Sequence, residues 1–333
     1  MNAGLRINLI ARNNGVGLSA DLRLLGDALR AQGHAIEYTN IRGGKFHKYI
    51  VPAARRAAYA LRRLVRMPRF DLNLMLEHVR DEYAALAHRN AMIPNPEWQW
   101  PHEVARFAVL DHVLVKTHHA SSIFRTRGCR TTYIGFTSPD RLDLTVPRRR
   151  EFLHLAGRSE LKGTQRLLAL WRRHPEWPRL TVVQHAITAK PGPPSANIDH
   201  RIGYIDDASL KRLQNELRFH LCPSEAEGYG HYIVEALGVG AAVVTIDAAP
   251  MNELVTRERG VLVACRASGQ KNLAIVHEFD EDAMTVAVER LIATNDAGLD
   301  RLGAAARAWY EENDRGFGMR LKAGITAAMD SDH

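Results

Sequence analysis

Two glutamates eight residues apart lie at the start of a predicted helix, within residues 222–237. Glu227 precedes a Gly-Tyr-Gly turn at 228–230, and Glu235 lies about two helical turns further on, on a similar face. The glycines would let backbone amides approach a ligand, and a helix N-terminus favours an anion such as phosphate. Carboxylates in these places can accept hydrogen bonds from sugar hydroxyls. The plain alternative is a helix with an acid before its first turn and an exposed Glu235.

A pair of basic residues follows a second predicted strand. Arg158 and Lys162 lie four residues apart on a loop bordered by Gly157 and Gly163. The guanidinium offers a planar fork of donors and the ammonium a compact charge, so together they can clamp a diphosphate. The alternative is two ordinary surface cations.

Near the start of the chain, Gly15 and Gly17 follow an apolar run at 5–10. With Ala20 they fit the Gly-x-Gly-x-x-Gly/Ala turn of dinucleotide-binding folds, and Glu37 on the next strand could be its acidic partner. Glu37 falls inside its predicted strand rather than at the end, which weakens the match. A nicotinamide-dependent oxidoreductase, or a nucleotide-binding module without catalytic activity, therefore stays an alternative of a different class.

Alternating strands and helices must position these residues. Short apolar runs predict buried strands, and apolar residues three and four apart predict helices. Strands are predicted at 5–10, 34–39, 72–76, 90–93, 112–115, 131–134, 152–156, 181–185, 202–205, 219–222, 242–246 and 261–264. Helices are predicted at 18–31, 164–173, 209–215, 229–237, 283–293 and 299–312. This order favours an α/β fold with two doubly wound Rossmann-like parallel sheets facing a cleft, joined at the polar stretch 145–150.

The charge of the chain is uneven. Its formal net charge is +8, yet residues 42–70 contain nine basic residues and no acid, so the remainder is close to neutral. Within 52–67 the apolar residues follow one helical stripe and the arginines another. A basic amphipathic helix is typical of contact with an anionic membrane surface or a polyanion. A surface helix packed through its alanine face is the alternative, and nucleic acid is the less favoured partner.

Composition excludes several other classes. The chain has 333 residues, 46% of them hydrophobic and 25% charged, which is ordinary for a globular protein of about two domains. Cys129, Cys222 and Cys265 lie far apart, so neither a disulfide framework nor a zinc knuckle is expected. The longest apolar run, 236–246, is too short to span a membrane. We expect a cytoplasmic protein that can also lie at the inner face of the membrane.

The block around Glu227 and Glu235 resembles the retaining GT-B glycosyltransferases of the group 1 type (family 4). The matching residues are Ser224, Glu227, Gly228, Tyr229, Gly230, Glu235, Ala236, Gly240, Val243 and Val244. The segment 250–255 is similar to the family's loop that ends in Glu-Leu-Val. The stretch from Gly157 to Gly163 resembles its strand, Gly-Arg, loop, Lys-Gly element. The resemblance covers most of 150–265 and is weaker over 1–150.

This resemblance implies a GT-B fold with three parts: an acceptor-side Rossmann-like domain at 1–147, a nucleotide-sugar-binding domain at 148–305, and a helical tail at 306–333 that can cross back to the first domain. It implies transfer of a sugar from a nucleotide-diphosphate sugar with retention of configuration, without a cofactor or an obligatory metal. We expect a carbohydrate or lipid-linked acceptor, in cell-surface polysaccharide or glycolipid synthesis. The same chemistry on a polyanion such as modified DNA is the alternative.

The resemblance also assigns roles. Arg158, Lys162 and the amides near Gly230 would stabilise the diphosphate, and Gly157, Gly228 and Tyr229 would belong to the same donor-binding site. Glu227 would position the donor sugar and Glu235 would hold the ribose hydroxyls. Gly15 and Gly17 would face the donor phosphates, and the base would lie near Tyr204 and Ile205. His78 is the candidate histidine beside the reacting sugar, and His118 and His119 compete for that role.

Overall fold

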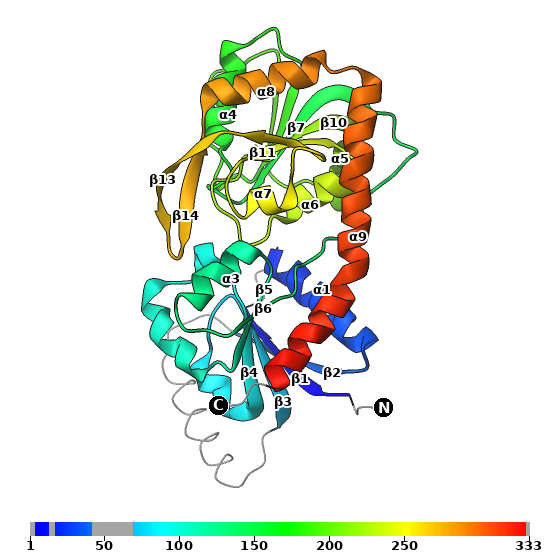
Figure 1. Cartoon of the computed structure of the whole chain (residues 1–333). Coiled ribbons are helices and arrows are strands. Elements are labelled where there is room, and N and C mark those ends of the chain that lie inside the picture. Colours follow the sequence, from blue (N-terminus) through cyan, green and yellow to red (C-terminus); the bar gives the residue numbers. More distant parts are fainter. Residues whose placement is uncertain (1–3, 13–16, 42–68, 331–333) are drawn as a thin grey trace. The chain divides into compact units, whose positions relative to one another are not determined.

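The computed structural model describes residues 4–12, 17–41 and 69–330. The chain forms two compact units, drawn in Figure 1. Unit 1 comprises Met1–Phe136 and Gly316–His333, and unit 2 comprises Thr137–Arg315. The domain boundaries expected at 147 and 305 stay predictions. The predicted basic segment, apart from Arg69 and Phe70, lies outside the described residues.

Unit 1 is built on a six-stranded parallel sheet of order β2-β1-β3-β4-β5-β6. Its strands are β1 (Arg6–Ala11), β2 (Ala35–Asn40), β3 (Phe70–Leu76), β4 (Ala87–Ile93), β5 (His112–Val115) and β6 (Thr131–Tyr133). Its helices include α1 (Gly17–Ala31), α3 (His118–Arg125) and the 3₁₀ helices η1 (Asp81–Leu86), η2 (Pro96–Trp98) and η3 (Pro101–Val109). The central strands are nearly continuous buried apolar runs, as parallel sheets covered on both faces require.

Unit 2 repeats this plan with the order β12-β11-β10-β7-β8-β9, again parallel. Its strands are β7 (Arg149–Gly157), β8 (Leu180–Gln184), β9 (Ile198–Ile202), β10 (Leu217–Leu221), β11 (Ala242–Ile246) and β12 (Val261–Val263). Its helices are α4 (Thr164–Arg173), α5 (Asp207–Glu216), α6 (His231–Gly238), α7 (Met251–Leu254) and α8 (Glu281–Ala293). The long helix α9 (Asp296–Met329) contributes residues to both units. The predicted pair of doubly wound sheets is confirmed.

The order of the strands fixes where ligands can bind. In unit 2 the chain runs one way through β7, β8 and β9 and the other way through β10, β11 and β12, so β7 and β10 flank the switch point. In unit 1 the corresponding switch lies between β1 and β3. Open parallel sheets bind ligands beyond the carboxyl ends of the strands at such points. The loops after β7 and β10 carry the charged residues that the sequence singled out.

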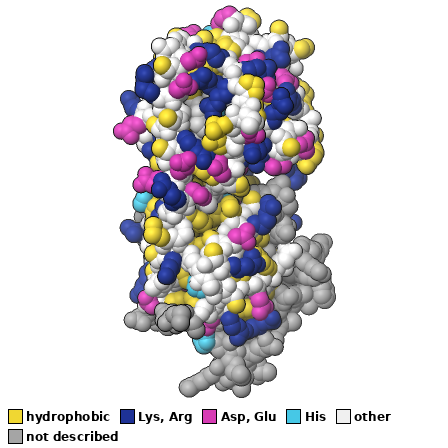
Figure 2. Space-filling view, turned by 90° about the vertical axis from the view of Figure 1, so that its right-hand side faces the viewer, with side chains coloured by type: hydrophobic (Ala, Val, Ile, Leu, Met, Phe, Trp, Pro, Cys, Tyr) yellow, Lys and Arg dark blue, Asp and Glu magenta, His cyan; other side chains and the backbone are white. Residues whose placement is uncertain are grey.

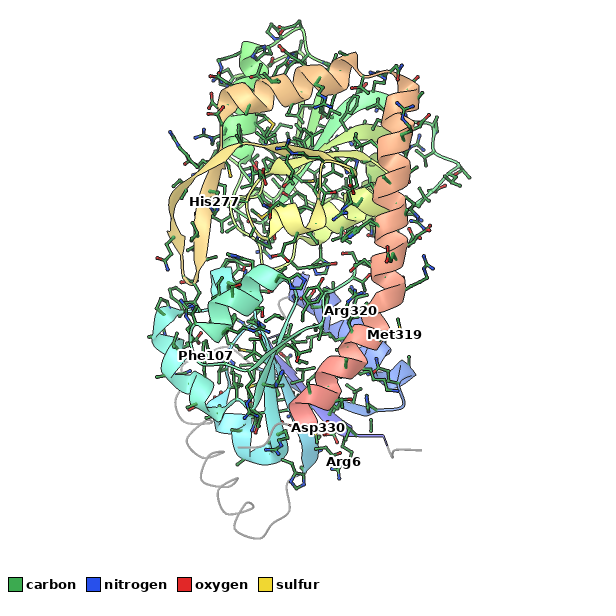
Figure 3. The ribbon with its side chains drawn as sticks, in the orientation of Figure 1. Arg6, Phe107, His277, Met319, Arg320 and Asp330 are labelled. Atoms are coloured by element: carbon green, nitrogen blue, oxygen red, sulfur yellow. The ribbon has the colours of Figure 1, made fainter. Side chains whose placement is uncertain are left out.

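Some predicted elements differ in the structure. The strand predicted at 202–205 lies earlier in the chain, at β9 (Ile198–Ile202), and shares only Ile202 with the prediction; Gly203, with φ +129°, turns the chain out of the sheet. A two-stranded antiparallel hairpin, β13 (Cys265–Lys271) and β14 (Ala274–Phe279), was not predicted. It extends from unit 2 and carries His277, labelled in Figure 3. The helix predicted at 299–312 belongs to the 34-residue α9.

The tail of α9 packs within unit 1. The ring of Phe317 lies edge-on to that of Phe136, with ring centroids 5.1 Å apart. Arg320 donates to the carbonyl of Ile134 through Nε at 3.0 Å, and Gln32 donates to the carbonyl of Gly318 at 3.0 Å. These contacts tie the end of the chain to the same unit as its beginning.

The surface of the described residues carries mixed charge. On the face shown in Figure 2, basic and acidic side chains are interspersed. Eight of the nine basic residues counted in 42–70 lie outside the described part, so the membrane and polyanion hypotheses stay predictions from the sequence. Among the helices that could be described, none has the length and apolar character needed to cross a membrane.

Two fully buried histidines lie beneath the switch point of unit 2. His154 on β7 donates through Nδ1 to the carbonyl of Leu221 at 2.8 Å, so its Nε2 accepts from the hydroxyl of Thr164 at 2.9 Å. His220 on β10 contacts backbone carbonyls through Nε2. Burial lowers the pKa of each ring to about 4. Both are therefore neutral structural groups that join β7, β10 and α4.

Because of these two histidines, we expect the stability of unit 2 to fall at acidic pH. Above pH 6.5 the rings are neutral in both folded and unfolded chains; between about 6.5 and 4 the unfolded chain alone takes up their protons. Stability therefore falls over that window, by up to about 3 kcal/mol for each ring. Urea unfolding of His154→Gln at several pH values should show a shallower acid loss than wild type, and His154→Gln with His220→Gln a shallower one still. An unchanged slope in both variants would contradict this account.

Candidate functional site

The loop after β10 brings three of the expected residues to the start of α6. The hydroxyl of Ser224, which is buried, donates to Oε1 of Glu227 at 2.6 Å. Gly230 has φ +99°, and a Cβ there would approach Ile233 and Leu254 at 3.1 and 3.2 Å, so the turn requires glycine. The helix begins at His231 rather than at the predicted residue 229. The helix thus begins four residues after Glu227, and the amides of Ile233 and Val234 donate to the carbonyl of Gly230.

The loop after β7 places Lys162 against that carboxylate. Lys162 Nζ pairs with Oε1 of Glu227 and lies 3.3 Å from the Ser224 hydroxyl. The side chains of this ion pair are 14% and 13% exposed, so it lies in a partly desolvated position. Gly163 has φ +64° and lies close to the carbonyl of Pro223, which seats the start of α4 against the loop after β10. The structure therefore brings together two groups that are 65 residues apart in sequence.

Tyr232 completes this cluster and was not predicted from the sequence. Lys162 Nζ lies 3.6 Å from the centroid of its ring, a cation–π contact. Because the Ser224 hydroxyl donates to Glu227, the Tyr232 hydroxyl must be the donor in its 2.5 Å bond to Ser224. Burial raises the pKa of Tyr232 well above its usual value, so the phenol stays protonated. The one signal in the sequence was an aromatic in the first turn of a helix.

The second glutamate has a different partner. Glu235 Oε2 accepts from Nε2 of Gln214, at the end of α5, at 2.7 Å. The side-chain oxygen Oε1 of Gln214 accepts in turn from Nε of Arg141, whose guanidinium pairs with Asp207 at 2.9 Å. The carboxylate of Glu235 is thus held in one orientation by a polar chain. Gln214 and Arg141 were missed because nothing in their sequence neighbourhoods marks them.

Gly157 and Arg158 lie exposed at the end of β7. Gly157 has φ +55°, and a Cβ there would meet nothing within 4 Å, so its conformation rather than crowding favours glycine. Arg158 makes no hydrogen bond or ion pair with the part of the chain that the structure describes. Its guanidinium is therefore available to a ligand, while Lys162 is already held by Glu227.

The remaining expected residues of unit 2 are spread over two loops. Tyr204 is 92% exposed, and Ile205 packs partly against the cluster that includes Leu153 and Leu213. Gly228 and Tyr229 are buried, and the Tyr229 hydroxyl accepts from Asn313 at 3.4 Å. Tyr229 thus supports the loop, and Tyr204 presents an open aromatic face after β9.

The β13–β14 hairpin is tethered to this loop. The amide of His277 donates to the carbonyl of Glu225 at 2.8 Å. Arg166 on α4 donates to Glu278 at 2.9 Å and to the carbonyl of Phe279 at 3.0 Å. Burial, and then the charge of Glu278, raise the pKa of Glu225. The hairpin therefore supports the loop that carries Glu227.

In unit 1, His78 lies two residues after the end of β3. Its Nδ1 lies 3.1 Å from Oε2 of Glu103, and its side chain is 23% exposed. Glu77 before it has φ +63°, a left-handed conformation that is uncommon for glutamate. His118 and His119 open helix α3, and the ring of His118 stacks on Tyr133 at 4.1 Å. Of the three histidines, His78 is thus the one in the loop after β3, beside the switch point of unit 1.

The glycine-rich turn of unit 1 is described in part. Gly15 lies outside the described residues, and Gly17 begins α1. Asp21 in the next turn forms a buried ion pair with Lys116, which follows β5, at 2.5 Å. Lys116 also donates to Asn95 at 3.2 Å. This pair fixes the start of α1 against the carboxyl end of the sheet.

Glu37 does not lie where a dinucleotide-binding fold has its acidic residue. Glu37 is the third residue of β2, and its carboxylate pairs with Arg69 at 2.6 Å. It therefore lies inside the strand, as predicted, rather than at the end where a ribose would bind. This position weakens the nicotinamide alternative.

Comparison with known proteins identifies the fold. No protein-family model matches the sequence, and no curated protein matches it. Among solved structures, a glycosyltransferase from Rickettsia africae is similar, with a TM-score of 0.73 at 10% identity, covering 99% of this chain and 100% of that one. Sucrose-phosphate synthase from Thermosynechococcus elongatus gives 0.69 at 16% identity, covering 96% and 98%. Anabaena HepE in complex with UDP and glucose gives 0.65 at 14% identity, covering 97% and 100%.

The chain therefore has the GT-B glycosyltransferase fold over nearly its whole length. The resemblance that the sequence shows to family 4 enzymes is confirmed at the level of the fold. One fold supports many reactions, so the residues of the site determine which reaction takes place.

Proposed function

We propose that this chain is a retaining glycosyltransferase that takes a sugar from a nucleoside-diphosphate sugar. The observation that carries the proposal is the cluster of Lys162, Ser224 and Glu227 at the switch point of unit 2, in a GT-B fold. The complex of HepE with UDP and glucose is consistent with a nucleotide-sugar donor.

The chemistry of the site fits a departing diphosphate. Cleavage of the bond between the anomeric carbon and the phosphate builds negative charge on the leaving group. Lys162, Arg158 and the amides at the start of α6 offer positive charge and donors to that group, and such preorganised groups stabilise a transition state. Glu227 holds Lys162 before the donor binds and then accepts from hydroxyls of the sugar. The leaving phosphate oxygen takes the acceptor's proton on the same face, so no covalent enzyme intermediate is needed.

Glu235 is proposed to bind the ribose hydroxyls. A carboxylate can accept from both vicinal hydroxyls, and the bond from Gln214 fixes the orientation of its plane. The base then lies beside Tyr204 and Ile205. The roles of Gly15 and Gly17 toward the phosphates stay proposals, as does an inner-membrane or polysaccharide setting.

Gln214 offers a test of this arrangement. Gln214→Leu should weaken the binding of the preferred nucleoside diphosphate about threefold to tenfold, the worth of one oriented hydrogen bond. Isothermal titration calorimetry measures the affinity, and a melting curve checks that the variant is folded. Equal affinity in the variant and in the wild type would argue against ribose recognition by Glu235.

The reaction itself is tested by product analysis. The protein is incubated with a panel of UDP-, GDP-, ADP- and dTDP-sugars and with simple acceptors, and nucleoside diphosphate release is followed. The anomeric proton of the product, observed by NMR, reports its configuration. We expect one donor class to react and an α-configured donor to give an α-linked product. A β-linked product would contradict retention.

Two hypotheses remain, and they differ in the acceptor. A carbohydrate or lipid-linked acceptor, with residues 42–70 on an anionic membrane, is the first. A polyanion such as modified DNA is the second, and it predicts a steep loss of affinity with salt. Flotation of the protein with vesicles that contain or lack anionic lipid separates them. Failure to float with anionic vesicles would contradict the membrane proposal.

A further inference from the structure

In unit 1, His78 and Glu103 belong to a polar cluster with defined hydrogen bonds. His78 Nδ1 and Oε2 of Glu103 are 3.1 Å apart, and the two residues come from the end of β3 and from η3. The same carboxylate oxygen accepts from Nε2 of Gln99 at 2.7 Å and from the amide of Trp100 at 3.4 Å. Gln99 is fully buried. The carboxylate is therefore held in place by two donors besides His78.

The ionisation of Glu103 decides which nitrogen of His78 carries the proton. Burial by itself would raise the pKa of Glu103, but the hydrogen bond and charge of His78, the Trp100 amide and the charge of Arg106 hold it below the usual value. An ionised carboxylate can only accept hydrogen bonds. Nδ1 of His78 must therefore be the donor, which leaves Nε2 of the neutral ring with its lone pair.

The backbone holds the other side of His78. Glu77 adopts its left-handed conformation while its amide donates to Ile93 at 3.0 Å and its Oε1 accepts from Asn95 at 3.3 Å. The amide of His78 donates back to Leu76 at 2.8 Å. A left-handed backbone conformation costs free energy at a residue other than glycine, and such conformations are often found at functional sites. His78 is thus held by hydrogen bonds at its backbone amide and at Nδ1 of its ring. Part of its side chain remains exposed.

We propose that Glu103 is a positioning residue for His78, holding the Nδ1–H tautomer so that Nε2 accepts a hydrogen bond from a sugar hydroxyl. The inference rests on the proposed transferase function. A hydroxyl suits this place better than a phosphate, because the lone pair of Nε2 and the nearby carboxylates of Glu77 and Glu103 repel an anion. The hydroxyl belongs either to the transferred sugar or to the acceptor.

The first test is spectroscopic and needs no turnover. In protein labelled with ¹⁵N-histidine at alkaline pH, the ring nitrogens of His78 are assigned by their loss in His78→Asn. The wild type should show a protonated Nδ1 and a bare Nε2. Glu103→Met should move the ring toward the Nε2–H tautomer that predominates in free histidine. A wild-type ring already in the Nε2–H form, or one that Glu103→Met leaves unchanged, would overturn the proposal.

The second test measures turnover of the donor selected from the nucleotide-sugar panel. Glu103→Met should lower kcat/KM about tenfold, the worth of one hydrogen bond at the upper end of its range. Glu103→Gln should recover most of this loss, because its carbonyl oxygen can still accept from Nδ1. The matched control is the surface pair of His174 and Glu176, in which Nδ1 likewise contacts a carboxylate oxygen, at 3.0 Å. Glu176→Met should change the tautomer of His174 and leave turnover unchanged.

Two arms of the turnover assay show which molecule carries the hydroxyl that His78 binds. One follows nucleotide release without an acceptor, and the other follows transfer to free hexoses and octyl glycosides. A loss in both arms places the hydroxyl on the transferred sugar, and a loss in transfer alone places it on the acceptor. Wild-type turnover by Glu103→Met in both arms would overturn the proposal. If the wild type used no donor at all, the transferase function would fail, while the tautomer experiment would still decide the role of Glu103.

Discussion

Lys162→Met should lower the rate of sugar transfer by about 10²–10³-fold, the cost of removing one preorganised charge-stabilising group from an active site. Lys162 lies with Glu227 and Ser224 at the start of two helices, where the leaving diphosphate is expected. The loss should appear mainly in kcat, because charge on the leaving group is greatest in the transition state. Nucleotide release from the selected donor under saturating conditions gives the rate.

The control for this variant is Lys190→Met. Lys190 is exposed in the same unit and makes no ion pair with the residues described. It should react at the wild-type rate. Because Lys162→Met leaves the carboxylate of Glu227 without its cation, both variants are first checked by melting curves. A folded Lys162→Met protein with wild-type kcat would remove Lys162 from the mechanism.

Lys116→Met should destabilise unit 1 by about 3–5 kcal/mol, because it leaves the buried carboxylate of Asp21 without its cation. The two side chains are 3% and 4% exposed and lie 2.5 Å apart. Lys116 also contacts Asn95 and lies 4.7 Å from the centroid of the Phe136 ring. Urea unfolding, followed through the transition of unit 1, gives the free energy.

A double variant tests whether the loss of stability comes from the ion pair. Lys116→Met combined with Asp21→Leu removes both charges, and apolar replacements of buried pairs are often close to neutral in stability. The double variant should therefore be more stable than Lys116→Met alone. If the two changes were simply additive, the ion pair would not be the source of the loss.

The sequence predicted the sheets well because buried parallel strands are short apolar runs. The strand at 242–246 and the helix at 164–173 have the predicted bounds. The hairpin of β13 and β14 was not predicted because the side chains of β13 are largely exposed, so that strand lacks the apolar alternation of a half-buried strand. The strand predicted at 202–205 was misplaced, because β9 ends at Ile202, where Gly203 adopts a backbone conformation that a sequence pattern does not reveal.

The candidate site was predictable where its residues belong to one motif. Glu227, Gly230 and Glu235 lie on one loop and helix, and Lys162 was visible beside its own glycine. The partners that orient them come from distant elements. Gln214 is 21 residues from Glu235, and Glu103 is 25 residues from His78. Such pairs depend on how the sheet brings strand ends and helices together, and the spacing of single residues does not encode this.

The most direct test of the central claim is thermal stabilisation by a panel of nucleoside diphosphates and nicotinamide dinucleotides. A ligand at about 100 times its dissociation constant adds about 2.7 kcal/mol of stability. We expect one nucleoside diphosphate to stabilise the wild type, with the shift reduced in Arg158→Ala and Glu235→Gln and retained in the surface control Arg212→Ala. Stabilisation by a nicotinamide dinucleotide alone, unaffected by Arg158→Ala and Glu235→Gln, would contradict the account.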